Sequence, residues 1–180
     1  MNPLFVSSGY AEPEVVTLAS GGALDLSTLP AFLRVLLTTD GTVTKSIESY
    51  FWEPVRVVTI EQKRTQLSEE FTSLKKKPGD ELLVREVQLV GERSKRIYAH
   101  AHSYVCPEAL PAEMCSDLEL GKVGIGELLR ECGLETYREL MHLDKEEHDG
   151  AVSISRTYRI VMAHAPIIQI TEKFPLAVYL

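Results

Sequence analysis

The stretch LVREVQL at residues 83–89 indicates both a fold element and a candidate site. Its apolar residues alternate with other residues at a period of two, which is typical of a β-strand with one buried face. Arg85 therefore points to the same side as Leu83, Val87 and Leu89. The sequence predicts a positively charged side chain that faces the core.

The stretch IQITEKF at residues 168–174 repeats this arrangement with the opposite charge. Glu172 shares a face with Ile168 and Ile170, so it too is expected to point inward. An unpaired charge costs several kcal/mol to bury and needs an ion partner, several hydrogen bonds or a ligand. Two explanations stay open: the two inward charges belong to structural ion pairs, or they bind a small molecule.

Composition and charge exclude several classes of protein. A chain of 180 residues with 44% hydrophobic content is long enough for one core. Its net charge of −7 argues against a general nucleic-acid binder, which needs a basic surface. No apolar stretch approaches the roughly 18 residues of a membrane span, and the first residues lack the basic start of a secretory signal. We expect a cytosolic protein with no nucleic-acid or membrane partner, as a monomer or weak dimer.

Metal and cofactor signals are absent from the sequence. Cys106, Cys115 and Cys132 are odd in number and widely spaced, which favours reduced thiols over disulfides or a zinc site. His100 and His102 share a strand face without an acidic or cysteine partner at ligand spacing, so we predict no metal site. Phosphate loops, dinucleotide fingerprints and serine nucleophile elbows are also missing from the sequence.

The chain divides into an arm and a domain. Residues 1–25 are rich in Gly, Ser, Ala and Pro and predict an extended or partly ordered N-terminal arm, and residues 26–180 predict a single domain. The domain is expected to start with a helix that Ser27 caps, that carries Pro30 in its first turn and that ends near residues 40–41.

Further elements follow from periodicity and turn residues. A short second helix is expected after Thr42 or Thr44, and another is opened by GIG at residues 124–126. The segment between two of the predicted strands that contains KKKPG at 75–79 is read as a loop preceded by a helix, and residues 110–111 and 117–121 mark a connector. The predicted strands are 55–61, 82–90, 97–105, 136–143, 153–162 and 167–174, of which 136–143 suits a helix equally and is taken as a strand.

The predicted strand 97–105 has one face of small residues. Ala99, Ala101 and Ser103 lie on this face. Small side chains facing a core leave room for either a closely packed helix or a bound ligand, and from the residues alone we favour the helix.

The inward charges suit the recognition of a small acid. A guanidinium group can bind a planar carboxylate through two parallel charge-assisted hydrogen bonds. An inward carboxyl group in an apolar site can donate or accept a proton. The glycines around Ile125 leave backbone N–H groups accessible to a carboxylate, although a tight turn explains them equally well.

Four segments in a fixed order resemble a known family. They are LLTTDGTVTK at 36–45, LVREVQL at 83–89, GIGELL at 124–129 and PIIQITEKF at 166–174. Their order and spacing are similar to those of the chorismate pyruvate-lyase family, especially its divergent branch outside the ubiquinone pathway. The resemblance covers the chain from about residue 28 to its end. It implies a single α+β domain, with an antiparallel β-sheet and with helices and flaps enclosing a buried ligand site.

The resemblance also implies a reaction and its catalytic residues. The family converts chorismate into 4-hydroxybenzoate and pyruvate by elimination and aromatisation, without a cofactor. Arg85 matches the arginine that holds the ring carboxylate, and Glu172 matches the glutamate near the ring hydroxyl.

Further substrate-binding residues follow from the same match. Ile125, with Gly126 beside it, stands where the backbone contacts the aromatic acid, and Val43 stands at an apolar flap position where the ubiquinone-pathway enzymes have Met. Thr44 and Lys45 follow it, and Lys45 is a candidate to hold a substrate carboxylate.

Two alternatives remain. The related effector-binding fold of transcription regulators could make the chain a non-catalytic sensor of small aromatic acids, although the residues before Ser27 lack the signals of a helix-turn-helix. The chain could also be a lyase that forms another hydroxybenzoate.

Overall fold

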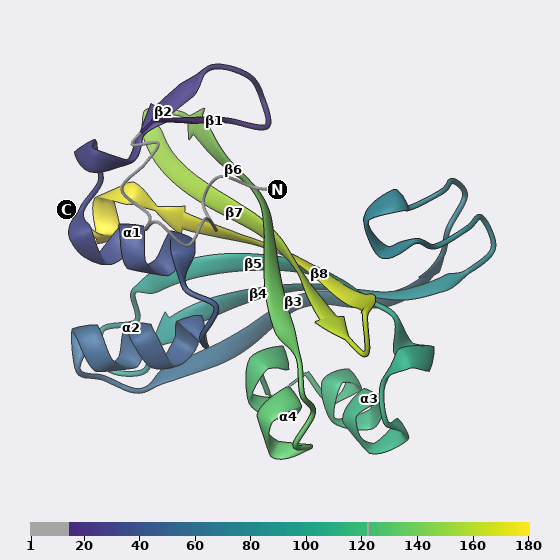
Figure 1. Cartoon of the computed structure of the whole chain (residues 1–180). Coiled ribbons are helices and arrows are strands. Elements are labelled where there is room, and N and C mark those ends of the chain that lie inside the picture. Colours follow the sequence, from purple (N-terminus) through teal and green to yellow (C-terminus); the bar gives the residue numbers. More distant parts are fainter. Residues whose placement is uncertain (1–14, 122) are drawn as a thin grey trace.

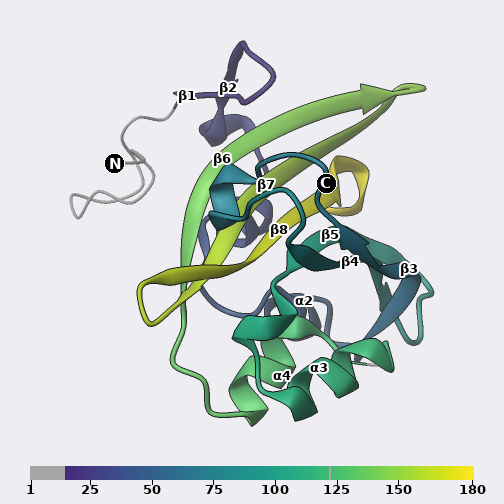
Figure 2. The same ribbon diagram turned by 90° about the vertical axis from the view of Figure 1, so that its right-hand side faces the viewer.

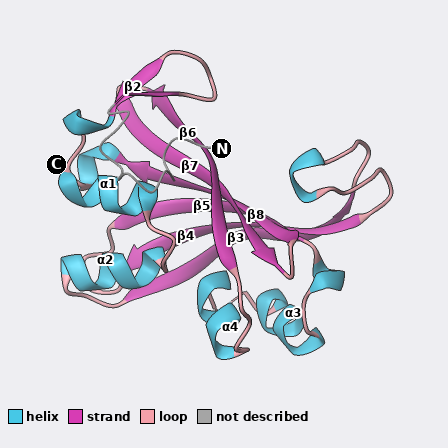
Figure 3. Cartoon of the chain, in the orientation of Figure 1, coloured by secondary structure: helices cyan, strands magenta, loops and turns pink. Residues whose placement is uncertain are grey.

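The computed structural model of the protein describes residues 15–180 except residue 122 (Figure 1). A six-stranded antiparallel sheet with the order β3-β4-β5-β8-β7-β6 forms its centre. Figure 3 shows the α-helices along the margins of this sheet, which confirms the predicted single α+β domain. The strands are β3 Val55–Gln66, β4 Glu81–Gly91, β5 Ile97–Val105, β6 Tyr137–His148, β7 Ala151–Met162 and β8 Ala165–Pro175, and the helices are α1 Ala31–Thr38, α2 Val43–Phe51, α3 Ala112–Glu119 and α4 Ile125–Glu131.

A small hairpin precedes the main sheet. It consists of β1 Val15–Thr17 and β2 Ala23–Asp25, and the N–H of Ala19 donates to the carbonyl of Leu143 on β6. Figure 2 shows the hairpin beside the β6–β7 end of the sheet. Part of the predicted arm is thus paired structure, whereas its residues 1–14 lie outside the described residues. The boundary at residue 25 stays a prediction.

Most predicted strands are confirmed, some with greater length. β5 has the predicted bounds, and the ambiguous segment 136–143 belongs to the longer strand β6. β7 and β8 form the predicted antiparallel pair. Their turn is tighter than expected, since only Ala163 and His164 separate the strands, with φ values of 47° and 66°. A two-residue turn of positive φ matches the twist of paired strands.

The first helix begins later than the sequence predicted. Ser27 lies in a 3-10 turn, Leu26–Thr28, and its N–H donates to Asp25 at 2.9 Å. α1 starts at Ala31 after Pro30, whose ψ of 140° is extended. The prediction that Ser27 caps α1 is wrong because the side chain of Asp25 already folds the preceding turn. α2 and α4 occur where expected, after Thr42 and Gly124.

Two connecting segments differ from the predictions. β3 and β4 stay paired as far as Gln66 and Glu81, so the helix expected before Lys75 is reduced to the 3-10 turn Thr72–Leu74. The connector expected at 110–121 contains α3, whose Met114 and Leu118 are fully buried. None of the helices in the described ranges is long and apolar enough to cross a membrane.

A buried carboxylate organises the turn between β4 and β5. Glu53, just after α2, accepts hydrogen bonds from the N–H groups of Arg93 and Ser94 at 3.0 Å each, and from the hydroxyls of Ser94 and Tyr98. These bonds, led by that of Tyr98, lower the pKa of Glu53 from 4.5 to about 2.

We expect Glu53→Gln to lower the melting temperature at pH 7. The folded-state pKa lies below the ordinary value, so the carboxylate stabilises the fold above pH 4.5 and loses this effect as the pH falls toward 2. Thermal unfolding followed between pH 7 and pH 3 should therefore show the gap between variant and wild type closing with acidity. Glu70→Gln, in the exposed part of the β3–β4 loop, is the control. A gap that does not change with pH would contradict this role.

Candidate functional site

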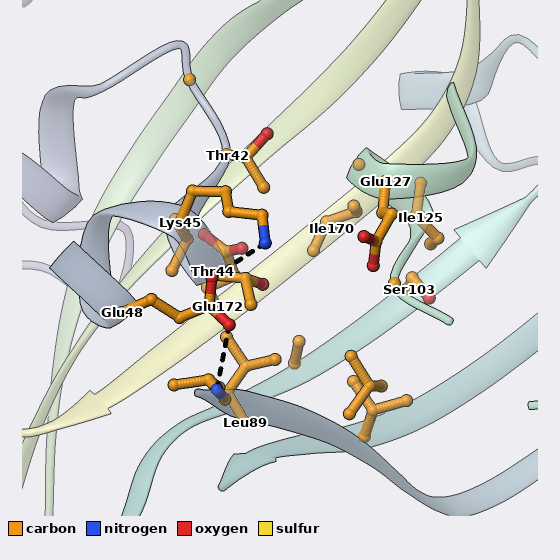
Figure 4. Close-up of a pocket in the computed structure, with 18 of the residues that line it drawn as sticks. Thr42, Thr44, Lys45, Glu48, Leu89, Ser103, Ile125, Glu127, Ile170 and Glu172 are labelled. Atoms are coloured by element: carbon orange, nitrogen blue, oxygen red, sulfur yellow. Dashed lines mark hydrogen bonds and ion pairs between the residues drawn. The ribbon is translucent and has the colours of Figure 1, made fainter. Parts of the chain in front are cut away.

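A cavity of about 320 Å³ lies between the sheet and the first turns of α2 and α4. Each of the six strands contributes at least one residue to its wall. Its volume is at the lower end of the range of roughly 300–1,000 Å³ found for ligand pockets, which suits a small molecule. Figure 4 shows residues of α2, of α4 and of the strands converging on this space.

The structure brings together all the site residues predicted from the sequence. Each of them lines the cavity, although their roles stay predictions: Val43, Thr44, Lys45, Arg85, Ile125, Gly126 and Glu172. Arg85 and Glu172 are both buried, as the strand periodicity predicted.

The small residues of β5 form the cavity wall between the two charges. Arg85 is paired with Ser103 across β4 and β5, and Ala101 is paired with Glu172 across β5 and β8. The charges are thus two strands apart, about 10 Å, and offset by one two-residue repeat, about 7 Å. Ala101 and Ser103 line the cavity, so their small side chains leave space for a ligand. The closely packed helix that the sequence favoured does not fill this space.

Arg85 is a buried cation without an anionic partner. It is 1% exposed, and its Nε donates to Oε1 of Gln62 at 2.7 Å, with a weaker contact of Nη2 to the carbonyl of Val123 at 3.4 Å. Among the residues that the structure describes, no carboxylate forms an ion pair with it. Burial lowers the pKa of its guanidinium group. A bound carboxylate would supply the missing charge.

Glu172 has partners of its own. Its Oε2 accepts a hydrogen bond from Nε of Arg156 at 2.8 Å, and its Oε1 accepts one from the hydroxyl of Tyr158 at 3.2 Å. The apolar surroundings expected for Glu172 are therefore wrong, because a guanidinium group and a hydroxyl face it. Of the two explanations for the inward charges, the ion pair applies to Glu172 but not to Arg85.

Arg156 and Tyr158 were missed by the sequence analysis. Both lie on β7, where Arg156 is 2% exposed and also donates through Nη1 to the carbonyl of Thr39 at 2.6 Å. Arg156 and Tyr158 share a strand face with Ile154 and Ile160, at a period of two. The periodicity that identified Arg85 would have identified them as well.

Lys45 is already paired within the cavity wall. Its Nζ lies 2.9 Å from Oε2 of Glu48, and this bond raises the pKa of Lys45. The side chain of Lys45 is 53% exposed. Figure 4 shows this pair, and Glu48 also accepts the N–H of Val55 at 3.0 Å. The proposed carboxylate contact of Lys45 would have to compete with Glu48.

The start of α4 forms part of the cavity wall, and an arginine of β6 lies beside it. The N–H groups of Glu127 and Leu128 donate to the carbonyl of Gly124, so those of Ile125 and Gly126 precede the first hydrogen-bonded turn. Arg138 of β6, which the sequence analysis also missed, lines the cavity next to Gly126. Its Nη1 donates to the carbonyl of Asp40 at 2.7 Å.

Metal ligands are not gathered in this site. In residues 15–180 without residue 122, no group of three or more His, Cys, Asp or Glu is arranged to hold a metal ion. The polar groups that line the cavity are guanidinium groups, carboxylates, the amine of Lys45 and the hydroxyls of Tyr158, Ser103, Thr42 and Thr44.

Comparison with known proteins assigns the family. The model of the family described as chorismate pyruvate-lyase Rv2949c-like matches residues 37–180. Chorismate pyruvate-lyase of Mycobacterium tuberculosis is 24% identical over 161 residues, which are 82% of this chain and 81% of the relative. The enzyme of the same name from Mycobacterium leprae is 25% identical over 162 residues, 82% of this chain and 75% of the relative.

A solved structure shares the fold. The effector domain of PhnF from Mycobacterium smegmatis superposes with a TM-score of 0.58 and 11% sequence identity, over 75% of this chain and 88% of that domain. This likeness concerns the fold alone, whereas the family model covers the segments that line the cavity. The chain belongs to the Rv2949c-like family of chorismate pyruvate-lyases.

Proposed function

We propose that the protein is a lyase that converts chorismate into 4-hydroxybenzoate and pyruvate. The observation that carries this proposal is the buried Arg85, which lines a small cavity and has no anionic partner among the described residues. A ring carboxylate bound to Arg85 would neutralise that charge through paired hydrogen bonds. The names of the mycobacterial relatives support the same activity.

The proposed binding mode places the ring across β5. With its carboxylate at Arg85, the ring would lie over Ala101 and Ser103, whose small side chains leave room for it. Its opposite end would then reach Glu172, two strands away. Val43 and Ile125, both buried, would pack against its faces and exclude water.

The reaction needs proton movement rather than a redox or nucleotide cofactor. As the bond between C3 and the ether oxygen breaks, its electron pair leaves with enolpyruvate. C4 loses its hydrogen as a proton, and the electrons of that C–H bond complete the aromatic ring. The released enolpyruvate takes a proton on carbon and becomes pyruvate. We assign Glu172 to the ring hydroxyl and to assistance of proton transfer, with substrate orientation supplying much of the rate.

Arg156 and Tyr158 would keep Glu172 in a fixed orientation. The Nε of Arg156 and the hydroxyl of Tyr158 bind different oxygens of the carboxylate, and both side chains are buried. Groups locked by neighbouring hydrogen bonds lose less entropy when they meet the substrate. They act as positioning residues in this proposal.

Incubation of the purified protein with chorismate tests the reaction. We expect 4-hydroxybenzoate, identified by chromatography, and an equal amount of pyruvate, measured with lactate dehydrogenase. A different hydroxybenzoate would indicate a related lyase. If 4-hydroxybenzoate raises the melting temperature but no pyruvate is released, the proposed activity is wrong and a sensor of aromatic acids is favoured.

A further inference from the structure

The charges around the cavity are unevenly matched. Three of its lining carboxylates face cations in ion pairs: Glu48 with Lys45, Glu127 with Arg130, and Glu172 with Arg156. The fourth, Glu92, is exposed. Three lining arginines, in contrast, have no carboxylate partner in the described residues: Arg56, Arg85 and Arg138. An acidic chain thus presents surplus positive charge at this cavity.

Arg85 and Arg138 are the surplus cations that lie inside the wall. Arg56 is exposed on the edge strand β3, whereas Arg85 is buried and Arg138 is half-buried. They come from β4 and from the opposite edge strand β6. The cavity can therefore offer separate positive groups to two anionic groups of one ligand.

The guanidinium group of Arg138 is only partly satisfied. Nη1 donates to the carbonyl of Asp40 at 2.7 Å, while Nε is buried and has no hydrogen-bond partner. Nε has almost no surface that water can reach, so an anion in the cavity would meet this guanidinium group at Nη2, which lies beside Gly126. Such an anion would give Arg138 the charged partner that it lacks among the described residues.

Gly126 lies close to the guanidinium group of Arg138. A methyl group added at Gly126 would lie 3.3 Å from Nη2 of Arg138 and 3.5 Å from Cγ2 of Thr42. On the other side of the same segment, Nη2 of Arg85 contacts the carbonyl of Val123 at 3.4 Å. Residues 123–126 thus contact both guanidinium groups, Arg85 at Val123 and Arg138 at Gly126.

We propose that Arg138 binds the second carboxylate of the substrate, the one on the enolpyruvyl side chain, while Arg85 binds the ring carboxylate. This inference rests on the proposed function and adds a specificity-determining residue to it. 4-Hydroxybenzoate carries one carboxylate and lacks the group that Arg138 binds. Arg138 therefore strengthens the binding of the dicarboxylate substrate over that of the monocarboxylate product.

This assignment competes with the earlier prediction for Lys45. Lys45 is more exposed, and its charge is already matched by Glu48 at 2.9 Å. Arg138 has no carboxylate to exchange for the ligand, so its contact with an anion costs no existing ion pair. The two assignments, to Arg138 or to Lys45, predict opposite results in the same experiment.

Arg138→Gln and Lys45→Gln separate the two assignments, and Lys63→Gln, on the exposed surface outside the cavity wall, is the control. We expect Arg138→Gln to raise KM for chorismate about tenfold to a hundredfold, as for a lost charge-assisted bond. The Kd of 4-hydroxybenzoate, measured by calorimetry, should change less than about twofold, and Arg138→Lys should recover part of the loss. Lys63→Gln should change neither constant by more than about twofold, and Lys45→Gln should not reproduce the chorismate-selective loss. Equal weakening of both ligands by Arg138→Gln, or a chorismate-selective loss in Lys45→Gln, would overturn the inference.

A ligand that cannot react makes the test independent of turnover. 3-(Carboxymethoxy)-4-hydroxybenzoate carries a second carboxylate on an ether at the position of the enolpyruvyl group. We expect wild type to bind this diacid more tightly than 4-hydroxybenzoate, and Arg138→Gln to remove the difference. If wild type shows this preference without releasing pyruvate from chorismate, the proposed reaction fails and the role of Arg138 stands. A wild type that does not prefer the diacid overturns the role of Arg138.

Discussion

Glu172→Gln is expected to lower kcat for chorismate by about 10²- to 10⁴-fold, the usual contribution of a positioned acid or base. The amide keeps the shape of the side chain and can still accept the hydroxyl of Tyr158, which lies 3.2 Å from Oε1. It cannot accept a proton during the reaction. Turnover with a coupled pyruvate assay measures kcat, and calorimetry should show that the affinity for 4-hydroxybenzoate changes by less than about tenfold.

The same substitution removes the anionic partner of Arg156. Arg156 is 2% exposed and lies 2.8 Å from Glu172, so its guanidinium group would be left buried without a carboxylate. Breaking a buried ion pair costs about 3–5 kcal/mol of folding stability. The melting temperature of Glu172→Gln must be measured first, and turnover must be compared at a temperature where both proteins are folded.

Glu139→Gln, which breaks a more exposed ion pair of the same sheet, is the control for activity. Glu139 pairs with Arg159 at 2.7 Å across β6 and β7 of the same sheet, outside the cavity wall. The substitution Glu139→Gln should leave kcat for chorismate unchanged. If folded Glu172→Gln retained kcat within about threefold, Glu172 would be a structural partner of Arg156 and its assigned role in proton transfer would be wrong.

The inward charges could be predicted because strand periodicity is a local property. Arg85 and Glu172 each stand in a short run with apolar residues at a period of two, and both are buried. Arg156 and Tyr158 obey the same rule on β7, where they share a face with Ile154 and Ile160, and they could have been predicted in the same way. That Arg156 faces Glu172 depends on the register of β7 with β8, which neither strand specifies alone.

Other features depend on contacts that are distant in sequence. Met114 and Leu118, four residues apart and buried, are a helical signal for α3 that the connector prediction overlooked. Arg138, in contrast, could not have been identified from its strand. It reaches the cavity because the order of the strands and the position of α4 bring β6 next to Gly126. The strongly twisted sheet in Figures 1 and 2 illustrates this long-range arrangement.

Arg85→Met is expected to weaken the binding of both chorismate and 4-hydroxybenzoate by about 100- to 1,000-fold, because both carry the ring carboxylate and lose two charge-assisted bonds. The fold should tolerate this change, since Arg85 has no carboxylate that would be left unpaired, and a buried charge is replaced by an apolar chain of similar length. Calorimetry measures the affinities and thermal unfolding measures the stability.

Arg156→Met is the matched comparison for Arg85→Met, because it also removes a buried arginine but leaves Glu172 without its cation. We expect this variant to melt well below wild type, whereas Arg85→Met should melt at or above the wild-type temperature. Arg85 would be a structural residue if two results were found together. Arg85→Met would unfold as readily as Arg156→Met, and the folded Arg85→Met protein would bind 4-hydroxybenzoate with unchanged affinity. If Arg85 instead serves to bind a ligand, its removal weakens ligand binding and leaves the stability of the free protein intact. The reason is that its anionic partner is present only when the substrate is bound.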